Sequence, residues 1–387
     1  MSKMVVIHIS QDFTYGKPQL GGYGRILNTL DSTQRHIIYT ISNRDKLERK
    51  NFSVGSGFEV RQMPAFMSTG SFRERLICIR NVGDLIAEDI RSLGLKPNVF
   101  FGHSQLVNFY ILSRVKRQLA SETPLIWEFN AIWGGINVNS LKNRLVIKIM
   151  RYFERKIVKS ADALIFQTTA AEEWIQKLYG RANGKKLIIT NAVPESALNS
   201  NASVAKPSTP PKVLVNGLFD SMNGLGVLVE YLKKHPKPPV ELHFYGSGPW
   251  GEELKSLANG KEVVYHGPVP RNVMQEEYLK FDFHLIPRLK RVEADLFIPS
   301  KLLEAMAKGL VPIVSTVRGM TDVVEPEDGY IIEAGKAVAM AEVFEEIVGL
   351  SQGAWMIRSE RCRTKVRNLY IWGENHKKLA NLYAELS

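Results

Sequence analysis

A short stretch in the second half of the chain combines residue types that could bind a phosphorylated ligand. Pro299 fixes φ where a helix can begin, and Ser300 after it is a good capping residue. Lys301 falls in the first turn, at the positive end of the helix dipole, which favours an anion. Glu304 lies one turn further on, on the same face as Ser300. The pattern predicts a phosphate at the helix start and ribose-like hydroxyl groups at the carboxylate. A core helix whose Glu304 only faces water is the alternative.

The elements that position these residues can be predicted from the apolar residues around them. Leu302, Leu303 and Met306 share one face of the helix, and Gly309 supplies a left-handed stop. The apolar run 310–314 follows directly and predicts a buried strand. We therefore expect a short helix backed by a strand, with the helix start open to a ligand.

A glycine-rich segment near the beginning of the chain, Gly21-Gly22-Tyr23-Gly24-Arg25, precedes an amphipathic helical pattern. Glycines allow the backbone to approach a ligand closely, and the helix dipole behind them again favours an anion. The spacing is not that of a dinucleotide-binding fingerprint, and no acidic residue follows at the distance that such a site needs. The segment predicts backbone contact with a ligand but does not identify it.

The length and composition of the chain are those of a globular protein with two domains. It has 387 residues, of which 44% are hydrophobic and 23% charged. The first apolar run, Val5 to Ile9, is too short for the core of a signal peptide, and no stretch reaches the roughly 18 apolar residues that span a bilayer. Cys78 and Cys362 lie far apart, which predicts neither a disulfide framework nor a zinc site. We expect a cytoplasmic protein.

Half of the net charge of +12 falls in one predicted helix, 141–159. The basic residues of this segment, which contains one acidic residue, are Lys142, Arg144, Lys148, Arg151, Arg155, Lys156 and Lys159. Its apolar residues recur at helical spacing and are Leu141, Leu145, Ile149, Tyr152, Phe153 and Ile157. The helix is expected either to cover a sheet with its lysines merely solvated, or to contact an anionic membrane surface at the inner face of the membrane. Nucleic-acid binding is not expected, because interleaved exposed aromatic residues and recognition motifs are missing.

Strand-like and helix-like runs alternate through the first half of the chain. The predicted strands are Val5 to Ile9, His36 to Ile41, Val99 to Gly102, Leu125 to Phe129, Ala163 to Gln167 and Leu187 to Thr190. Helical patterns fall at 72–94, 106–119, 141–159 and 169–179. This alternation predicts a parallel, doubly wound α/β sheet, whose ligands bind at the carboxyl ends of the strands. His103 and Asn130 stand at two such ends and are candidate catalytic residues, with a structural role for the histidine as the alternative.

The proline-rich segment 203–212 predicts a linker between two such halves. In the second series the predicted strands are Val213 to Asn216, Glu241 to Tyr245, Val263 to His266 and Phe283 to Ile286, with helices near 224–234, 251–258 and 271–280. We expect two Rossmann-like domains, 1–205 and 206–368, that face each other across a ligand cleft. A closing helix, 369–387, is expected to cross back to the first domain.

Further motifs follow one another in a fixed order along nearly the whole chain. They are Glu154-Arg155, Ser160-Ala161-Asp162-Ala163, Thr190-Asn191-Ala192-Val193, Gly246-Ser247-Gly248-Pro249, Phe281 to Pro287, Arg318 to Asp322, and Trp372 with Tyr383. Together with the glycine-rich segment and the 297–309 stretch, the series resembles glycosyltransferase family four, whose members have the two-domain GT-B fold. The resemblance implies transfer of a sugar from a nucleotide-sugar donor to a glycan or lipid-linked acceptor in cell-surface polysaccharide synthesis, with retention at the anomeric carbon.

The resemblance also assigns roles to single positions. The first domain would hold the acceptor and the second the donor. Glu304 matches the glutamate expected on the ribose hydroxyls, and Gly22 matches the glycine whose amide faces the donor phosphate. The expected donor site comprises Gly21, Gly22, Gly217, Gly248, Arg288, Ser300, Lys301, Leu302 and Glu304, and the expected catalytic residues are His103, Asn130 and Arg288. We expect neither a cofactor nor a metal, because oriented amides and cations would stabilise the departing diphosphate.

Three positions depart from the pattern of that family. Leu296 stands in place of the first glutamate of its pair, and Leu218 and Asn223 stand in place of an arginine and a lysine that contact the diphosphate. Each lost contact is worth about 1.5–3 kcal/mol when it is a charged hydrogen bond. The candidates to replace these cations are Arg288, Lys290, Arg291 and Lys301. A nucleotide-sugar epimerase, which shares the fold, and a degenerate relative that only binds a ligand or partner are the alternative functions.

Overall fold

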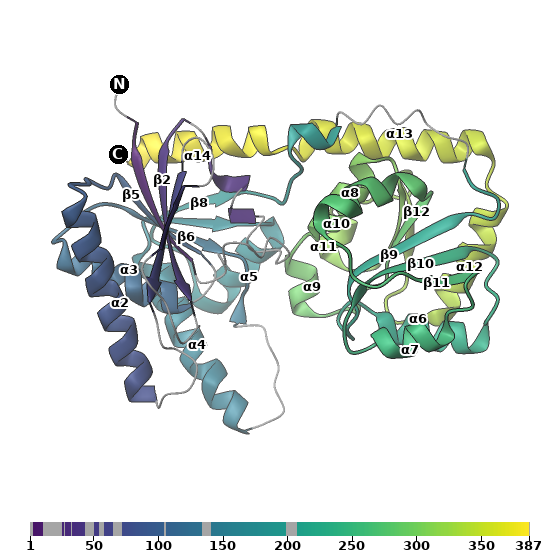
Figure 1. Ribbon diagram of the computed structural model, residues 1–387, viewed down its shortest axis with the longest axis horizontal. Helices are drawn as coiled ribbons and strands as arrows, with labels where there is room; N and C mark the ends of the chain where they lie inside the picture. The colour runs from purple at the N-terminus through teal and green to yellow at the C-terminus, as the bar shows by residue number, and fades with distance from the viewer. Residues whose placement is uncertain are drawn as a thin grey trace. The chain divides into compact units, whose positions relative to one another are not determined.

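The structure is a computed structural model that describes residues 3–10, 25–26, 28–31, 33–42, 50–53, 58–64, 72–103, 106–133, 141–198 and 207–386. The chain forms two compact units, each with its own sheet (Figure 1). Unit 1 is Met1–Ile189 together with Glu374–Ser387, and unit 2 is Thr190–Gly373. The predicted α/β class with two Rossmann-like domains is therefore confirmed.

The described part of unit 1 contains an eight-stranded sheet. Its strands, in spatial order, are β3 (Lys50–Ser53), β4 (Phe58–Pro64), β2 (Arg35–Ser42), β1 (Val5–Ser10), β5 (Val99–His103), β6 (Leu125–Phe129), β7 (Ala163–Phe166) and β8 (Lys185–Ile188). Neighbouring strands are parallel, except that β3 runs antiparallel to β4. β5, β6 and β7 are buried along their whole length, which is why they appear in the sequence as nearly continuous apolar runs.

The helices of unit 1 follow the predicted pattern closely. They are α2 (Phe72–Ser92), α3 (Leu106–Gln118), α4 (Leu141–Ser160), α5 (Thr169–Tyr179) and, at the end of the chain, α14 (Trp372–Leu386). From Glu374 onward α14 belongs to unit 1, where His376 Nε2 donates to the carbonyl of Asn28 at 2.7 Å. From Glu374 onward the closing helix thus packs on elements of the first half of the chain.

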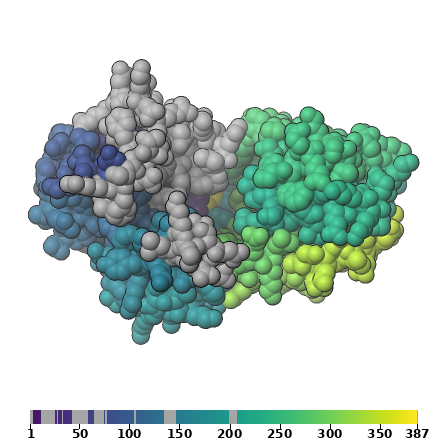
Figure 2. Space-filling model, turned by 90° about the horizontal axis from the view of Figure 1, so that it is seen from below, coloured from purple at the N-terminus to yellow at the C-terminus, as the bar shows by residue number. Residues whose placement is uncertain are grey.

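The sheet of unit 2 has six strands among the described residues, all parallel. In spatial order they are β11 (Val263–Tyr265), β10 (Glu241–Ser247), β9 (Lys212–Leu218), β12 (Phe283–Ile286), β13 (Val311–Ser315) and β14 (Tyr330–Ile332). The α-helices are α6 (Leu225–Lys234), α7 (Gly251–Leu257), α8 (Arg271–Glu277), α9 (Val292–Leu296), α10 (Ser300–Ala307), α11 (Arg318–Thr321), α12 (Ala337–Val348) and α13 (Gln352–Leu369), and the 3₁₀ helices are η2 (Glu195–Leu198) and η3 (Tyr278–Lys280). Within this unit α12 packs on α6 and α13 on α10, and Figure 2 shows the yellow-green atoms of the later residues beside the green atoms of the earlier ones.

The boundary between the units differs from the expected one at 205/206. Val193 pairs with Ile371 in an isolated bridge, and Ala197 and Leu198 pack on an apolar cluster of unit 2. Lys308 Nζ also donates to the carbonyl of Ala197 at 2.8 Å. Because these contacts tie 190–198 to unit 2, the division falls between Ile189 and Thr190 and not at the proline-rich segment.

The helix that contains Lys301 begins one residue away from the predicted cap. Pro299 is the N-cap, and Ser300 is already the first helical residue, with no side-chain capping hydrogen bond at this end. Gly309 has φ 87°, as the predicted left-handed stop requires. Leu302 and Met306 are fully buried, so α10 is anchored in the core and its first turn has a fixed place in the unit.

Candidate functional site

The carboxyl ends of β9 and β12 place the residues of the predicted donor site in unit 2. Lys301 extends from the first turn of α10 to the end of β9, where its Nζ donates to the carbonyl of Asn216 at 2.6 Å. Gly217 has φ 110°, and a Cβ at this position would lie 3.2 Å from Lys301 Nζ. A glycine therefore suits the position, because it adopts this backbone conformation without strain and leaves room for the ammonium group.

Arg288, which follows β12, lies in the same region as Lys301. Its guanidinium makes two long hydrogen bonds, from Nε to Asn223 Oδ1 at 3.4 Å and from Nη1 to the Phe297 carbonyl at 3.4 Å. Burial lowers the pKa of Arg288, while the charge of Asp220 opposes that change. Arg288 is therefore held by two uncharged acceptors at long distance, and a phosphate would bind its guanidinium more strongly.

The pKa of Lys301 is lowered to about 7, first by burial and then by the charge of Arg288, and Asp220 only partly offsets these effects. Two cations thus share one region with one carboxylate. An excess of positive charge that is removed from water favours the binding of an anion. The other two candidate cations, Lys290 and Arg291, are exposed to solvent, so the structure favours Arg288 and Lys301 as the pair at this site.

Glu304 does not face water, which rules out the alternative of a solvated core helix. The residue is 8% exposed, and its carboxylate accepts from Arg271 Nη2 at 2.6 Å and from Gln275 Nε2 at 2.9 Å, both on α8. Burial, and after it the charge of Glu304, raise the pKa of the Tyr278 phenol, so this hydroxyl lies close to the carboxylate. The carboxylate is thus held in place, one turn along the same helix from Lys301.

The remaining predicted donor residues of unit 2 contribute through packing in this structure. A Cβ at Gly248 would lie 2.6 Å from the Phe219 carbonyl oxygen, so the glycine allows the ends of β9 and β10 to approach each other. Leu302 is fully buried, and its amide donates to the Pro299 carbonyl at 3.1 Å. Of the departures from the family pattern, Leu296 is buried and Leu218 is 56% exposed.

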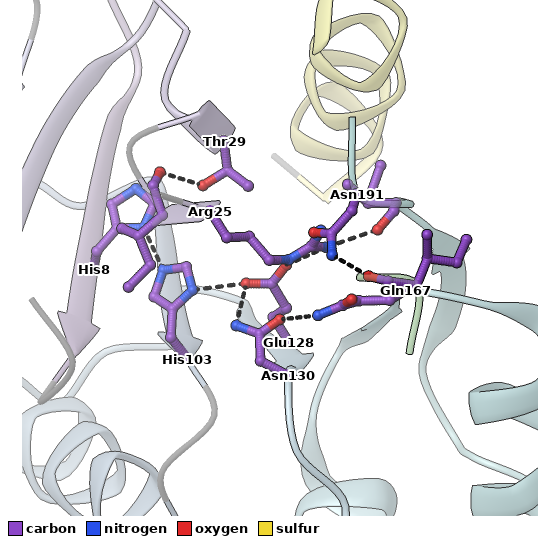
Figure 3. Close-up of polar contacts among 11 residues, drawn as sticks. His8, Arg25, Thr29, His103, Glu128, Asn130, Gln167 and Asn191 are labelled. Carbon is purple, nitrogen blue, oxygen red and sulfur yellow. Dashed lines mark hydrogen bonds and ion pairs between the residues drawn. The ribbon is translucent and has the colours of Figure 1, made fainter. Parts of the chain in front are cut away.

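The predicted catalytic residues of unit 1 lie in a polar cluster (Figure 3). His103 is fully buried, donating from Nδ1 to Glu128 Oε2 at 2.9 Å and accepting at Nε2 from His8 Nδ1 at 3.0 Å. Asn130 donates to the same Glu128 oxygen at 3.1 Å and accepts from Gln167 Nε2 at 3.1 Å. Because both ring nitrogens of His103 are occupied inside the core, its geometry is that of a structural residue, whereas Asn130 remains partly exposed. Gly21 and Gly22 lie outside the described residues.

The centre of this cluster is a buried ion pair that the sequence pattern did not single out. Arg25 donates from Nε to Glu128 Oε1 at 2.8 Å and from Nη2 to the carbonyl of Ile189 at 2.7 Å. Although burial raises the pKa of Glu128, Arg25 and His103 outweigh it and lower that pKa to about 2. The available signal was the glutamate itself, since a charged residue inside the apolar strand 125–129 needs a buried partner.

The basic helix α4 presents its charges to solvent. Lys148, Arg151, Arg155, Lys156 and Lys159 are all exposed. Tyr152, which was predicted on the covered side, is instead 63% exposed. The covered side includes the fully buried Ile157 and the half-buried Phe153, whose ring meets Tyr110 edge-on. Among the described residues, no helix is long and apolar enough to cross a membrane.

The chain is similar to a protein family over part of its length and to a curated protein over most of it. Residues 210–349 match the model described as Glycosyl transferases group 1. The chain is also 25% identical over 332 residues to an exopolysaccharide phosphotransferase of Streptomyces coelicolor, a match that covers 78% of this chain and 34% of the relative. The chain thus spans about a third of the length of that curated relative.

Solved structures resemble the chain over almost its whole length. A sucrose-phosphate synthase from Thermosynechococcus elongatus is similar with a TM-score of 0.74 at 17% identity, covering 99% of both chains. A glycosyltransferase from Rickettsia africae gives 0.68 at 15%, covering 100% of this chain and 99% of its own. Anabaena HepE, in complex with UDP and glucose, gives 0.69 at 14%, covering 98% and 99%. Residues 210–349 therefore match a group 1 glycosyltransferase domain, and the chain as a whole has the GT-B fold.

Proposed function

We propose that the chain is a retaining glycosyltransferase of family four that moves a sugar from a nucleotide-sugar donor to a glycan or lipid-linked acceptor in cell-surface polysaccharide synthesis. The observation that carries the proposal is the pairing of Lys301 and Arg288 at the ends of β9 and β12, with the Glu304 carboxylate one helical turn away. The two cations would bind the diphosphate of the donor, and the carboxylate would bind the ribose hydroxyls.

The chemistry of the transfer fits this arrangement. When the bond between the anomeric carbon and the phosphate oxygen breaks, negative charge develops on the departing diphosphate. Cations that are already desolvated stabilise that charge without having to reorganise. Arg288, which follows β12, and Lys301, on α10, would therefore replace the charges that Leu218 and Asn223 do not supply.

Nucleoside diphosphates provide the direct test of donor binding. Uridine, guanosine, adenosine and cytidine diphosphate are each added to the purified chain, and the thermal midpoint is measured. At least one should raise the midpoint, and Glu304→Gln should remove most of that rise. Asp328→Asn is the matched control, because this carboxylate is also buried in unit 2 but is bound by Lys365. If none of the four ligands shifts the midpoint of the wild type, donor binding is refuted.

A binding protein without transferase activity is the second candidate function. It is favoured by Glu304, whose two oxygens are already occupied by Arg271 and Gln275. Arg271 is the weaker anchor, since its side chain is 44% exposed and can turn toward solvent when a ribose arrives. Incubation with nucleotide sugars decides between the two functions: release of the nucleoside diphosphate, even by slow hydrolysis, supports the enzyme, and its complete absence supports the binding protein.

We also propose that α4 contacts an anionic membrane surface from the cytoplasmic side. Its exposed basic residues would each contribute about 1 kcal/mol near acidic lipids, and the exposed Tyr152 would lie at the headgroup level. Sedimentation with vesicles that contain phosphatidylglycerol should fall when Lys148, Arg151, Arg155 and Lys156 become glutamine. Changing the same number of exposed lysines in unit 2, namely Lys234, Lys237, Lys255 and Lys261, should leave sedimentation unchanged. Equal sedimentation of the two variants would refute a specific role of α4.

A further inference from the structure

A chain of buried polar side chains lies beneath the proposed donor site in unit 2. Asn216, near the end of β9, is 7% exposed, and Tyr278 and His284 are 1% and 0% exposed. Asn216 Oδ1 accepts from His284 Nε2 at 2.9 Å, and Asn216 Nδ2 donates to the Tyr278 hydroxyl at 2.9 Å. Three polar groups with almost no access to water are thus joined in one line across β12, β9 and η3.

The direction of the hydrogen bonds in this line follows from its members. Since Asn216 Oδ1 can only accept, His284 Nε2 must carry the proton, and burial together with the charge of Lys301 keeps this imidazole neutral by lowering its pKa. Asn216 Nδ2 then donates to the oxygen of Tyr278, a phenol whose pKa the nearby Glu304 charge raises. Both recorded donors therefore point the same way, from His284 through Asn216 to Tyr278, which lies beside the carboxylate.

Asn216 also contacts the other end of the proposed site. Its main-chain carbonyl accepts from Lys301 Nζ at 2.6 Å, while its side chain orients Tyr278. One residue is thus hydrogen bonded both to the proposed diphosphate cation and to the phenol beside the proposed ribose carboxylate. Among the described residues, Asn216 is the one with hydrogen bonds to both the Lys301 ammonium group and the Tyr278 hydroxyl.

We propose that Asn216 is a positioning residue that fixes the Glu304 carboxylate relative to the Lys301 ammonium group, so that the ribose and the diphosphate of one nucleotide are bound together. This inference rests on the proposed function, because it concerns the same donor site. It predicts that removing the Asn216 amide and the Tyr278 hydroxyl together weakens nucleoside diphosphate binding no more than removing either one. It also predicts that both changes affect the binding of the diphosphate alone much less.

The test compares two ligands on four variants by calorimetry. The ligands are inorganic pyrophosphate, which can contact only the cations, and the nucleoside diphosphate that raises the wild-type midpoint most. The variants are Tyr278→Phe, Asn216→Leu, the double variant that combines them, and Tyr231→Phe. The last is the control, since it removes the hydroxyl of another buried tyrosine of unit 2, on α6.

Each of the variants Tyr278→Phe and Asn216→Leu should lower the affinity for the nucleoside diphosphate roughly tenfold, as expected for the loss of one hydrogen bond to a charged group. The affinity of the double variant should be no lower than that of either single variant. Pyrophosphate affinity should change less than threefold in all variants, because the carbonyl of residue 216 still accepts from Lys301 after the side chain has changed. Tyr231→Phe should bind both ligands as the wild type does.

The possible outcomes separate the inference from the function on which it rests. A wild type that binds no nucleoside diphosphate overturns both. If the wild type binds but the variants lose affinity for both ligands equally, the role of Asn216 alone is overturned. The same holds if the affinity losses of the two single variants add in the double variant. If Asn216→Leu does not fold, Asn216→Asp carries the same test, because a carboxylate at this position would accept the Tyr278 hydrogen and withdraw it from Glu304.

Discussion

Replacement of Lys301 by methionine tests the electrostatics of the proposed site most directly. Burial and Arg288 lower the pKa of the lysine from 10.5 to about 7, so the group is about half charged at neutral pH when no ligand is bound. A bound diphosphate would favour the charged form and raise that pKa again. Binding at pH 8.5, where a lysine of pKa about 7 is almost entirely neutral, should therefore take up about one proton from the buffer.

Calorimetry in two buffers with different enthalpies of ionisation measures this proton uptake. The wild type should take up close to one proton per bound nucleoside diphosphate at pH 8.5, where the ligand phosphate is fully ionised. Lys301→Met should bind more weakly and take up almost none. If uptake is the same in both proteins, Lys301 is not the group that meets the phosphate, and the proposed diphosphate site is wrong.

The same substitution has a second consequence, for stability without ligand. The folded-state pKa lies below the unfolded value, so between about pH 7 and 10 the unfolded chain binds more protons and the free energy of unfolding rises with pH. A shift from 10.5 to about 7 corresponds to at most about 5 kcal/mol, and the partial exposure of the side chain reduces it. Lys301→Met should show no such rise, which urea unfolding at pH 7 and pH 9.5 would detect.

Three further predictions concern other contacts. Arg25→Met should destabilise the protein by about 3–5 kcal/mol in urea unfolding, because it leaves the fully buried Glu128 without its cation; a loss below 1 kcal/mol would contradict the buried pair. The Glu128 pKa of about 2 lies below its ordinary value, so its stabilisation is present above about pH 4.5 and is lost as the pH falls toward 2; Glu128→Gln should flatten acid unfolding in that window. Gly217→Ala should weaken nucleoside diphosphate binding and lower the thermal midpoint, since φ is 110° and the added Cβ would lie 3.2 Å from Lys301 Nζ; unchanged affinity would argue against a site at this loop.

The sequence predicted those parts of the fold that depend on local pattern. The parallel strands Leu125–Phe129 and Phe283–Ile286 have the predicted bounds, because buried parallel strands form short apolar runs between turn residues. β4 was missed because charged residues interrupt its apolar pattern. One of them, Arg61, is buried against Asp89 of α2, with Nη2 donating to Oδ1 at 2.8 Å. A partner 28 positions away along the chain leaves no periodic signal.

The same distinction applies to the candidate site. The stop at Gly309 and the placement of Lys301 and Glu304 one turn apart are local features, and the structure has them. The groups that these side chains contact are not local: Arg271 precedes Glu304 by 33 positions, and the acceptor for Lys301 is a main-chain carbonyl of Asn216, which every residue type possesses. Sequence could therefore indicate which residues carry charge, but not which protein groups hold them before a ligand arrives.

Under the proposed function, the departures at Leu218 and Asn223 are a relocation of positive charge and not its loss. Asn223 Oδ1 accepts from Arg288 Nε at 3.4 Å, so the residue that would stand in place of a lysine contacts an arginine that follows β12. A lysine at this position would add a third cation beside Arg288 and Lys301, with Asp220 as their common counter-charge. Like charges that are removed from water raise the free energy of one another's charged form. The presence of Arg288 and Lys301 therefore disfavours a cation at 223. Uncharged residues at 218 and 223 are thus physically consistent with two partly buried cations that come from other segments of the chain.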